Sequence, residues 1–363
     1  MSSVHNFNAG PAILPRPVLE QVQHELLDYQ GSGMSILEMS HRSKEYETIN
    51  AQAEQRIKQF LGVSDTHRVL FLQGGASLQF AMLPLNFLLP QSSADYIVSG
   101  AWGEKAYEEA VKIGQARIAG TTQAGQYRTV PPAESLQLDP TAAYVHVTTN
   151  ETIHGVQWPS LPDTGDRPLV ADMSSDILSG PLDGSRFTMI YAGAQKNLGP
   201  AGVTVVVIKT AFLSTASTAR TLPTMLSYAT HAKNSSLYNT PSVFAIYTLN
   251  LVLGWIEKIG GLEAMAERNA QKAQTIYQSI DRSGGFYHGH AEVFARSRMN
   301  VTFRLPSEEL EKQFVAEAAR EGMVGLAGHR ALGGVRASIY NAMELSSVQA
   351  LASFMTEFLR RNG

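Results

Sequence analysis

The 363-residue chain contains no cysteine. This absence excludes disulfides, cysteine-ligated metal or iron–sulfur sites, and any cysteine nucleophile. The first residues lack the basic start and the apolar stretch of a signal peptide, and no apolar run approaches the roughly 20 residues of a membrane span. We therefore expect a cytoplasmic protein with no membrane partner and no cysteine-based metal site.

Positive charge is not in excess either. Lysine and arginine number 29 against 32 aspartates and glutamates, so the formal net charge is −3. Proteins that bind nucleic acid usually carry a basic excess or a basic stripe, so no nucleic-acid partner is expected. A small acidic ligand remains compatible with this balance, because a few clustered cations can hold it locally.

The composition is that of a folded chain, with 44% hydrophobic and 17% charged residues. That apolar content is enough for a sizeable core and argues against disorder. At roughly 150 residues per domain, the length fits a large domain with a smaller partner. We expect an N-terminal segment at 1–15, a large domain at 16–255 and a small C-terminal domain at 256–363.

Short apolar segments alternate with helical ones through the large domain. Helical periodicity marks residues 17–29, 43–61, 77–88 and 103–113, and strands are expected at 69–72, 96–98, 144–148, 169–171, 189–192 and 203–208. This alternation predicts an α/β fold with a mostly parallel sheet covered by helices on both faces. Such sheets bind ligands at the carboxyl ends of their strands, so the residues that follow each strand are the first candidates.

The last third of the chain has a different pattern. Residues 242–281 are helical apart from Gly260 and Gly261, and we expect this segment to cross between the domains. Residues 283–363 form a mixed α+β stretch with expected strands at 299–303 and 335–339.

A carboxylate and a lysine follow two successive strands. Asp172 ends the strand at 169–171, and Lys196 lies in a glycine-rich turn after the strand at 189–192. Enzymes of pyridoxal 5'-phosphate (PLP) need this pair, because lysine forms an imine with the cofactor aldehyde while an aspartate keeps the pyridine nitrogen protonated. Either residue alone is more often a turn cap or a surface lysine, but the pair in this setting favours the cofactor site.

Two segments are candidate phosphate sites. Residues 74–77 (GGAS) lie between a strand and a helix, where free backbone N–H groups and the helix N-terminus favour an anion. In the second segment, Thr240 fits an N-cap and Pro241 the first helical position. Each signal is weak by itself, since glycine-rich turns and capped helices are common.

Aromatic, hydroxyl and cationic side chains complete the candidate set. Trp102 follows the strand at 96–98 and could stack on an aromatic cofactor, or it could be a core anchor. Thr152 follows the strand at 144–148 and could reach a ring oxygen or serve only in a turn. Arginine binds carboxylates and phosphates through a planar fork, and the cationic candidates are His41, Arg42, His329, Arg330 and Arg336.

With these residues identified, the chain resembles the phosphoserine aminotransferase family, which consists of PLP enzymes of fold type I. The resemblance runs from residue 6 to residue 342. Its distinctive stretches are residues 39–43 (MSHRS), 73–77 (QGGAS), 150–155 (NETIHG), 171–175 (ADMSS), 193–200 (GAQKNLGP) and 328–330 (GHR).

The resemblance implies a role for each candidate. Lys196 would bond to the cofactor aldehyde and move the substrate proton, and Asp172 would pair with the pyridine nitrogen. The remaining implied cofactor contacts are Trp102 on the ring, Thr152 at its phenolic oxygen, Ala76, Ser77 and Gln195 at the phosphate, and Asn239 and Thr240 at the phosphate of a partner subunit. The active form is therefore expected to be a homodimer.

The resemblance also implies how the substrate is held. Arg336 would bind the α-carboxylate, and the distal anion would meet His41, Arg42, His329 and Arg330. Some relatives carry a hydroxyl at the position of Ala9, where this chain offers only its backbone.

The implied reaction is reversible ping-pong transamination between glutamate and 3-phosphohydroxypyruvate in serine biosynthesis. The sequence leaves open whether 4-phosphohydroxy-L-threonine of vitamin B6 synthesis is also made. An aminotransferase for alanine and glyoxylate is the nearest alternative, but its substrates lack a distal anion and would not need the extra cations. A cysteine desulfurase is excluded because the chain has no cysteine. A nucleotide-binding regulatory module remains as an alternative outside enzymes, and it would leave Lys196 without a role.

Overall fold

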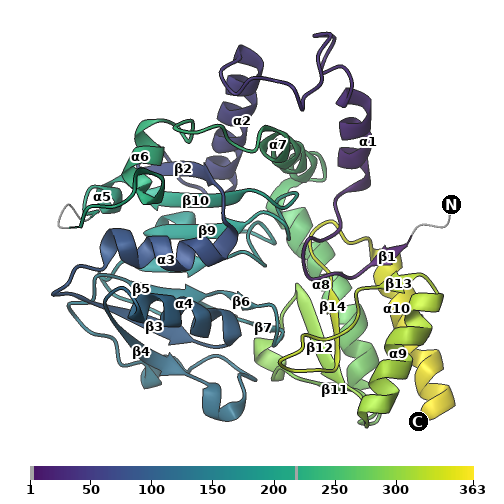
Figure 1. The fold of residues 1–363 in the computed structure, drawn as a ribbon. Helices are drawn as coiled ribbons and strands as arrows, with labels where there is room; N and C mark the ends of the chain where they lie inside the picture. Colours follow the sequence, from purple (N-terminus) through teal and green to yellow (C-terminus); the bar gives the residue numbers. More distant parts are fainter. Residues whose placement is uncertain (1–3, 217–219) are drawn as a thin grey trace.

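A seven-stranded sheet forms the centre of the computed structural model, which describes residues 4–216 and 220–363 (Figure 1). Its strand order is β2-β10-β9-β8-β5-β3-β4. The pairings from β9 to β4 are parallel, whereas β10 runs antiparallel to both of its neighbours. The strands are β2 (His67–Leu72), β3 (Ser93–Val98), β4 (Gln115–Thr121), β5 (Val145–Thr148), β8 (Leu169–Asp172), β9 (Met189–Gly193) and β10 (Thr204–Lys209).

Helices cover both faces of this sheet because successive side chains of a strand point to opposite faces. In β8, Leu169 and Ala171 pack with α2 (Lys44–Phe60) and α7 (Val243–Lys258), while Val170 packs with α3 (Gly75–Phe87) and α4 (Ala101–Val111). The α/β fold with a mostly parallel, two-sided sheet is therefore confirmed. The shorter helices beside this core are α1 (Arg16–Glu25), α5 (Thr210–Leu213) and α6 (Tyr228–Lys233).

The C-terminal part builds its own core around a three-stranded antiparallel sheet of order β11-β12-β14. The N-terminal β1 (His5–Asn6) pairs with β13 (Met323–Val324), and Phe7 lies in this same core. The remaining elements are β11 (His288–Gly289), β12 (Asn300–Arg304), β14 (Val335–Ser338), α8 (Gly261–Asp281), α9 (Glu308–Arg320) and α10 (Leu345–Asn362). The two ends of the chain thus meet in one small α+β unit (Figure 1).

Several expected boundaries were wrong. The first helix ends at Glu25 rather than at residue 29, and strand β4 was not predicted at all. β4 is an edge strand with mostly exposed or half-buried residues, so it lacks the apolar run that marks its neighbours. The helical segment after residue 242 does break at Gly260, whose φ of 106° is left-handed, and the two halves α7 and α8 meet at 86°.

The domain division at residue 255/256 stays a prediction. The start of α8 contributes Leu262 and Met265 to the core of the large sheet, while Ala273, Ile276 and Ile280 of the same helix belong to the C-terminal core. Within the described residues, no single helix has the length and apolar content to cross a membrane, and the bent pair α7 and α8 passes that test only when the two are joined.

Candidate active site

A cavity of about 300 Å³ lies at the carboxyl ends of the parallel strands and brings together residues from distant parts of the chain. Most of the expected cofactor residues line it, together with two of the expected cations. Its walls are formed by Ala9, Gly10, Gly75, Ala76, Ser77, Trp102, Thr148, Asn150, Thr152, Asp172, Ser174, Ser175, Gln195, Lys196, His329 and Arg336.

Lys196 lies in this cavity because β8 and β9 are parallel neighbours, with Asp172 beside Tyr191 in the register. Its Nζ donates a hydrogen bond of 2.6 Å to Oγ1 of Thr152. Burial lowers the pKa of Lys196 to about 8, although Asp172 and Glu151 act in the opposite direction. A substantial fraction of this amine is therefore neutral near physiological pH, as a nucleophile or base requires.

Asp172 is fully enclosed at the end of β8, and burial raises its pKa. One oxygen, Oδ1, accepts hydrogen bonds from the backbone and the hydroxyl of Ser174, at 2.9 and 2.6 Å. A cation placed against the carboxylate would lower that pKa again, so the site favours a positively charged partner. A protonated pyridine nitrogen meets this need.

The N-terminus of α3 provides an anion site on another wall. Its N-cap is Gly74, which has a φ of 92° and offers no side chain to the first amides. A Cβ at Gly74 would come within 2.5 Å of Leu78, so the turn requires glycine. The uncapped first turn contains Ala76 and Ser77, whose location fits the phosphate of a cofactor.

Trp102 lies in the first turn of α4 and lines the cavity near Lys196. The ring centroid is 5.8 Å from Nζ of Lys196, and the indole Nε1 is buried without a hydrogen-bond partner among the described residues. The ring therefore offers a flat apolar face beside the reactive amine.

Arg336 and His329 place positive charge at the cavity. Burial lowers the pKa of Arg336, and its Nε is buried without a hydrogen-bond partner within residues 4–216 and 220–363. Burial lowers the pKa of His329 as well, and the neighbouring Arg336 adds to that effect. A partly buried guanidinium with an unpartnered Nε favours an anionic ligand.

Five expected residues do not line this cavity: His41, Arg42, Asn239, Thr240 and Arg330. The predicted helix start in the second phosphate segment was wrong, because α7 begins at Val243 with Ser242 as its N-cap. Nδ2 of Asn239 instead donates a hydrogen bond of 3.3 Å to Oε1 of Gln73, next to the turn that begins α3.

Sequence reasoning missed several residues that the cavity contains. Thr148, Ser174 and Ser175 lie at strand ends, so the rule that singled out Asp172 could have found them. Gly10 lies far away in the sequence and gives no such signal. The backbone oxygen of Ala9 accepts a hydrogen bond of 2.8 Å from Tyr340, so this position already has an internal partner.

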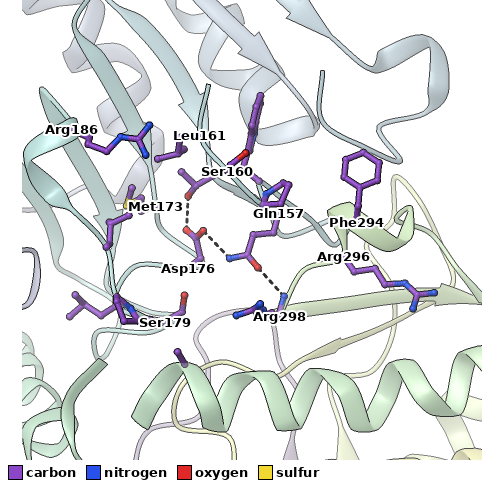
Figure 2. A pocket seen from close by; sticks show the side chains of 18 residues that line it. Gln157, Ser160, Leu161, Met173, Asp176, Ser179, Arg186, Phe294, Arg296 and Arg298 are labelled. Carbon is purple, nitrogen blue, oxygen red and sulfur yellow. Dashed lines mark hydrogen bonds between the residues drawn. The ribbon is translucent and has the colours of Figure 1, made fainter. Parts of the chain in front are cut away.

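A second and larger cavity, of about 420 Å³, lies beside the first and contains none of the expected site residues (Figure 2). At its wall, Asp176 accepts hydrogen bonds from Thr149 at 2.6 Å and from Gln157 at 3.2 Å. Its arginine Arg296 already forms a salt bridge of 2.6 Å with Asp281. The size of a cavity therefore does not identify the reactive centre.

Comparison with known proteins agrees with this geometry. Residues 4–351 match the model of the class-V aminotransferase family. The chain is 58% identical over 361 residues to the phosphoserine aminotransferase of Herpetosiphon aurantiacus, which covers 99% of this chain and 100% of the relative. A solved phosphoserine aminotransferase from Bacillus circulans subsp. alkalophilus superposes with a TM-score of 0.98 at 53% identity, and both chains are covered completely.

A PLP-bound phosphoserine aminotransferase from Trichomonas vaginalis is also similar, with a TM-score of 0.90 and 35% identity over 97% of this chain and 99% of that one. These matches run the full length of the chain and agree with the residues that the cavity brings together. The chain belongs to the class-V aminotransferase family.

Proposed function

We propose that the protein transfers the amino group of L-glutamate to 3-phosphohydroxypyruvate, forming 2-oxoglutarate and O-phospho-L-serine in a reversible step of serine biosynthesis. PLP is the cofactor. The observation that carries this proposal is the pocket in which Lys196, with its lowered pKa, faces Asp172 and the uncapped start of α3. The full-length identity to phosphoserine aminotransferases supports the choice of substrate.

The residues of the pocket fit PLP group by group. Asp172 would hold the protonated pyridine nitrogen, Trp102 would stack on the ring, and Thr152 would contact the phenolic oxygen. Ala76, Ser77 and Gln195 would hold the phosphate at the start of α3, where backbone N–H groups favour an anion. When bound, the cofactor supplies an electron sink for the bond that breaks at the substrate Cα.

Lys196 would act first as the covalent anchor of the cofactor and then as the base. Its Nζ would take the proton from the substrate Cα and return it on the same face of the pocket. The hydrogen bond to Thr152 fixes where Nζ points, and burial keeps part of the amine neutral. Both effects favour proton transfer at a defined position.

The substrate would be held at its two ends. Arg336 would bind the α-carboxylate, because its buried Nε lacks a hydrogen-bond partner among the described residues. His329 lies at the same cavity, and Arg330 follows it on the surface. Together with His41 and Arg42, these cations would accept a γ-carboxylate in one half-reaction and a phosphate in the other.

The protein would work as a homodimer. His41, Arg42, Asn239 and Thr240 lie outside the pocket of their own chain, although the resemblance assigns them to substrate or cofactor. Exposed apolar side chains occur in the part of the chain before His41, namely Leu19, Leu27, Met34 and Leu37, and directly before Asn239, namely Tyr238. Exposed apolar groups of this kind are typical of a surface buried on association, so we propose that these segments complete the partner's pocket.

A subunit-mixing experiment tests the homodimer. Lys196→Ala and Arg42→Ala subunits, each impaired alone, are unfolded together and refolded as a mixture. If Arg42 serves the partner's pocket, mixed dimers contain one intact site, and about a quarter of wild-type activity returns. No recovery, or a monomer in solution, would contradict the shared site.

The substrate is tested by absorbance spectroscopy of the purified protein with PLP. We expect a yellow protein whose visible band disappears when O-phospho-L-serine is added. A response to L-alanine but not to O-phospho-L-serine would keep the cofactor and overturn the substrate. A protein that stays colourless with PLP would overturn the enzyme itself. The same assay with 4-phosphohydroxy-L-threonine decides whether that compound is a second substrate.

A further inference from the structure

Glu151 is a buried carboxylate next to the pocket that the proposed mechanism does not use. It ends the short strand β6 (Asn150–Glu151), and its side chain is fully enclosed. Both oxygens accept hydrogen bonds from backbone amides of α4, Oε2 from Trp102 at 3.0 Å and Oε1 from Gly103 at 2.8 Å.

These two contacts replace the missing cap of α4. The N-cap position is Gly100, which has no side chain to accept from the first amides. Carboxylates commonly satisfy the free N–H groups at a helix start and interact favourably with its dipole. Here the carboxylate comes from Glu151, which is 49 residues away in the chain from Trp102.

The helix start is shaped around this side chain. A Cβ at Gly100 would lie 2.3 Å from Cδ of Glu151, and a Cβ at Gly103 would lie 3.3 Å from its Oε1. Position 100 therefore requires glycine to leave room for the carboxylate of Glu151. At position 103, glycine avoids a close contact with Oε1 of Glu151.

Glu151 thus joins two walls of the pocket. It holds the backbone of Trp102, and the next residue in the chain, Thr152, accepts the hydrogen bond of Lys196. We propose that Glu151 is a positioning residue that fixes the Trp102 ring relative to Lys196 and so sets the affinity for PLP. This inference rests on the proposed cofactor site.

The buried charge of Glu151 does not by itself distinguish this residue from other carboxylates near Lys196. Burial raises the pKa of Glu151 to about 7, against the lowering effect of the two backbone hydrogen bonds. Asp176 is similar in this respect, because burial also raises its pKa to about 7 and it too interacts with Lys196. Asp176, however, lines the second cavity (Figure 2), where its hydrogen bonds within the described residues come from Thr149 and Gln157 and not from α4. It therefore provides a control of equal charge without the positioning contact.

The test is a double-mutant cycle with PLP binding as the readout. Glu151→Gln keeps the shape but turns one acceptor into a donor that faces another donor. The loaded full-length proteins are dialysed and their PLP dissociation constants compared. We expect Glu151→Gln to weaken binding about tenfold in the Trp102 background and less than about twofold in the Trp102→Phe background.

A spectroscopic readout separates positioning from general damage. Near-ultraviolet circular dichroism isolates the Trp102 signal as the difference between a protein and its Trp102→Phe version. We expect Glu151→Gln to reduce that difference, and Asp176→Asn to leave it unchanged. Glu151→Asp keeps the charge but is one methylene shorter, so it should give an intermediate signal. If the glutamine variant fails to fold, the same binding and dichroism measurements are made on Glu151→Asp.

The outcomes distinguish this inference from the function on which it rests. An equal loss of affinity in both Trp102 backgrounds, or the same signal change in Asp176→Asn, would overturn the positioning role while leaving the enzyme intact. Failure of the wild-type protein to bind PLP would instead overturn the proposed function.

Discussion

Two cavities are lined by the segment that follows β8, and they differ in how far the protein itself provides partners for their polar groups. The smaller cavity, of about 300 Å³, contains Lys196, Arg336 and the uncapped start of α3. The larger one, of about 420 Å³, contains Asp176 and Arg296 (Figure 2). The hydrogen bonds of Asp176 come from neutral protein groups, and Arg296 is paired with Asp281.

This difference indicates which of the two cavities is available to a ligand. Both hold a buried carboxylate with a raised pKa, Asp172 in one and Asp176 in the other. In the first cavity, Arg336 has no salt bridge within the described residues and its buried Nε lacks a hydrogen-bond partner. In the second, Nε of Arg296 is also unpartnered, but both of its other nitrogens donate to Asp281. Groups that remain unsatisfied after folding are available for a ligand, whereas groups satisfied internally are structural.

The largest effect is expected from Lys196→Ala. Removal of the proposed covalent and proton-transferring group should lower turnover of glutamate by at least about a thousandfold. A single-turnover assay with bound PLP measures this loss. Activity within tenfold of wild type would show that the reactive group lies elsewhere and would remove the main difference between the two cavities.

Arginine truncations should separate the cavities next. Arg336→Ala should lower kcat/KM for glutamate about 10- to 100-fold, because a buried contact between guanidinium and carboxylate is lost. Arg298→Ala is the matched change at the second cavity, where Arg298 is exposed, and should stay within about twofold of wild type. Steady-state kinetics measures both variants. Equal losses of kcat/KM would show that the two cavities do not differ in substrate binding.

The pH dependence of cofactor uptake should report the lowered pKa of Lys196. Below about pH 8 the amine is mostly protonated and unreactive, so the rate of PLP uptake should rise up to tenfold per pH unit and level off above pH 8. Stopped-flow absorbance of PLP added to the cofactor-free protein measures this rate. A rise that continues to pH 10 would mean that burial does not lower the pKa.

The smallest effect should come from Asp176→Asn, seen as a change in the pH dependence of stability. The folded pKa of about 7 exceeds the ordinary aspartate pKa of 3.8, so the folded state binds more protons between these values. The free energy of unfolding should therefore fall as pH rises through this window, by up to about 1.4 kcal/mol per unit from this group. Urea titrations at pH 5.5 and 7 should show a shallower fall in the variant, and an unchanged fall would contradict the raised pKa.

The chemistry of the first cavity was readable from the sequence because it follows directly from strand ends. Asp172 and Lys196 come after successive strands, and parallel strands place such ends side by side. The residue pattern also predicted the α/β fold. It did not reveal β4, whose exposed edge position leaves no apolar run, or the true start of α7 at Val243.

The sequence by itself determined which groups are available: the pair Asp172 and Lys196 predicted a PLP site, and the family resemblance implied transamination with Arg336 at the α-carboxylate. Only the tertiary structure decided how these groups are supported, because contacts such as Glu151 with the start of α4 join segments 49 residues apart. No local pattern encodes such a contact. Burial likewise depends on the packed fold, and burial is what lowers the pKa of Lys196 and leaves Arg336 in need of an anion.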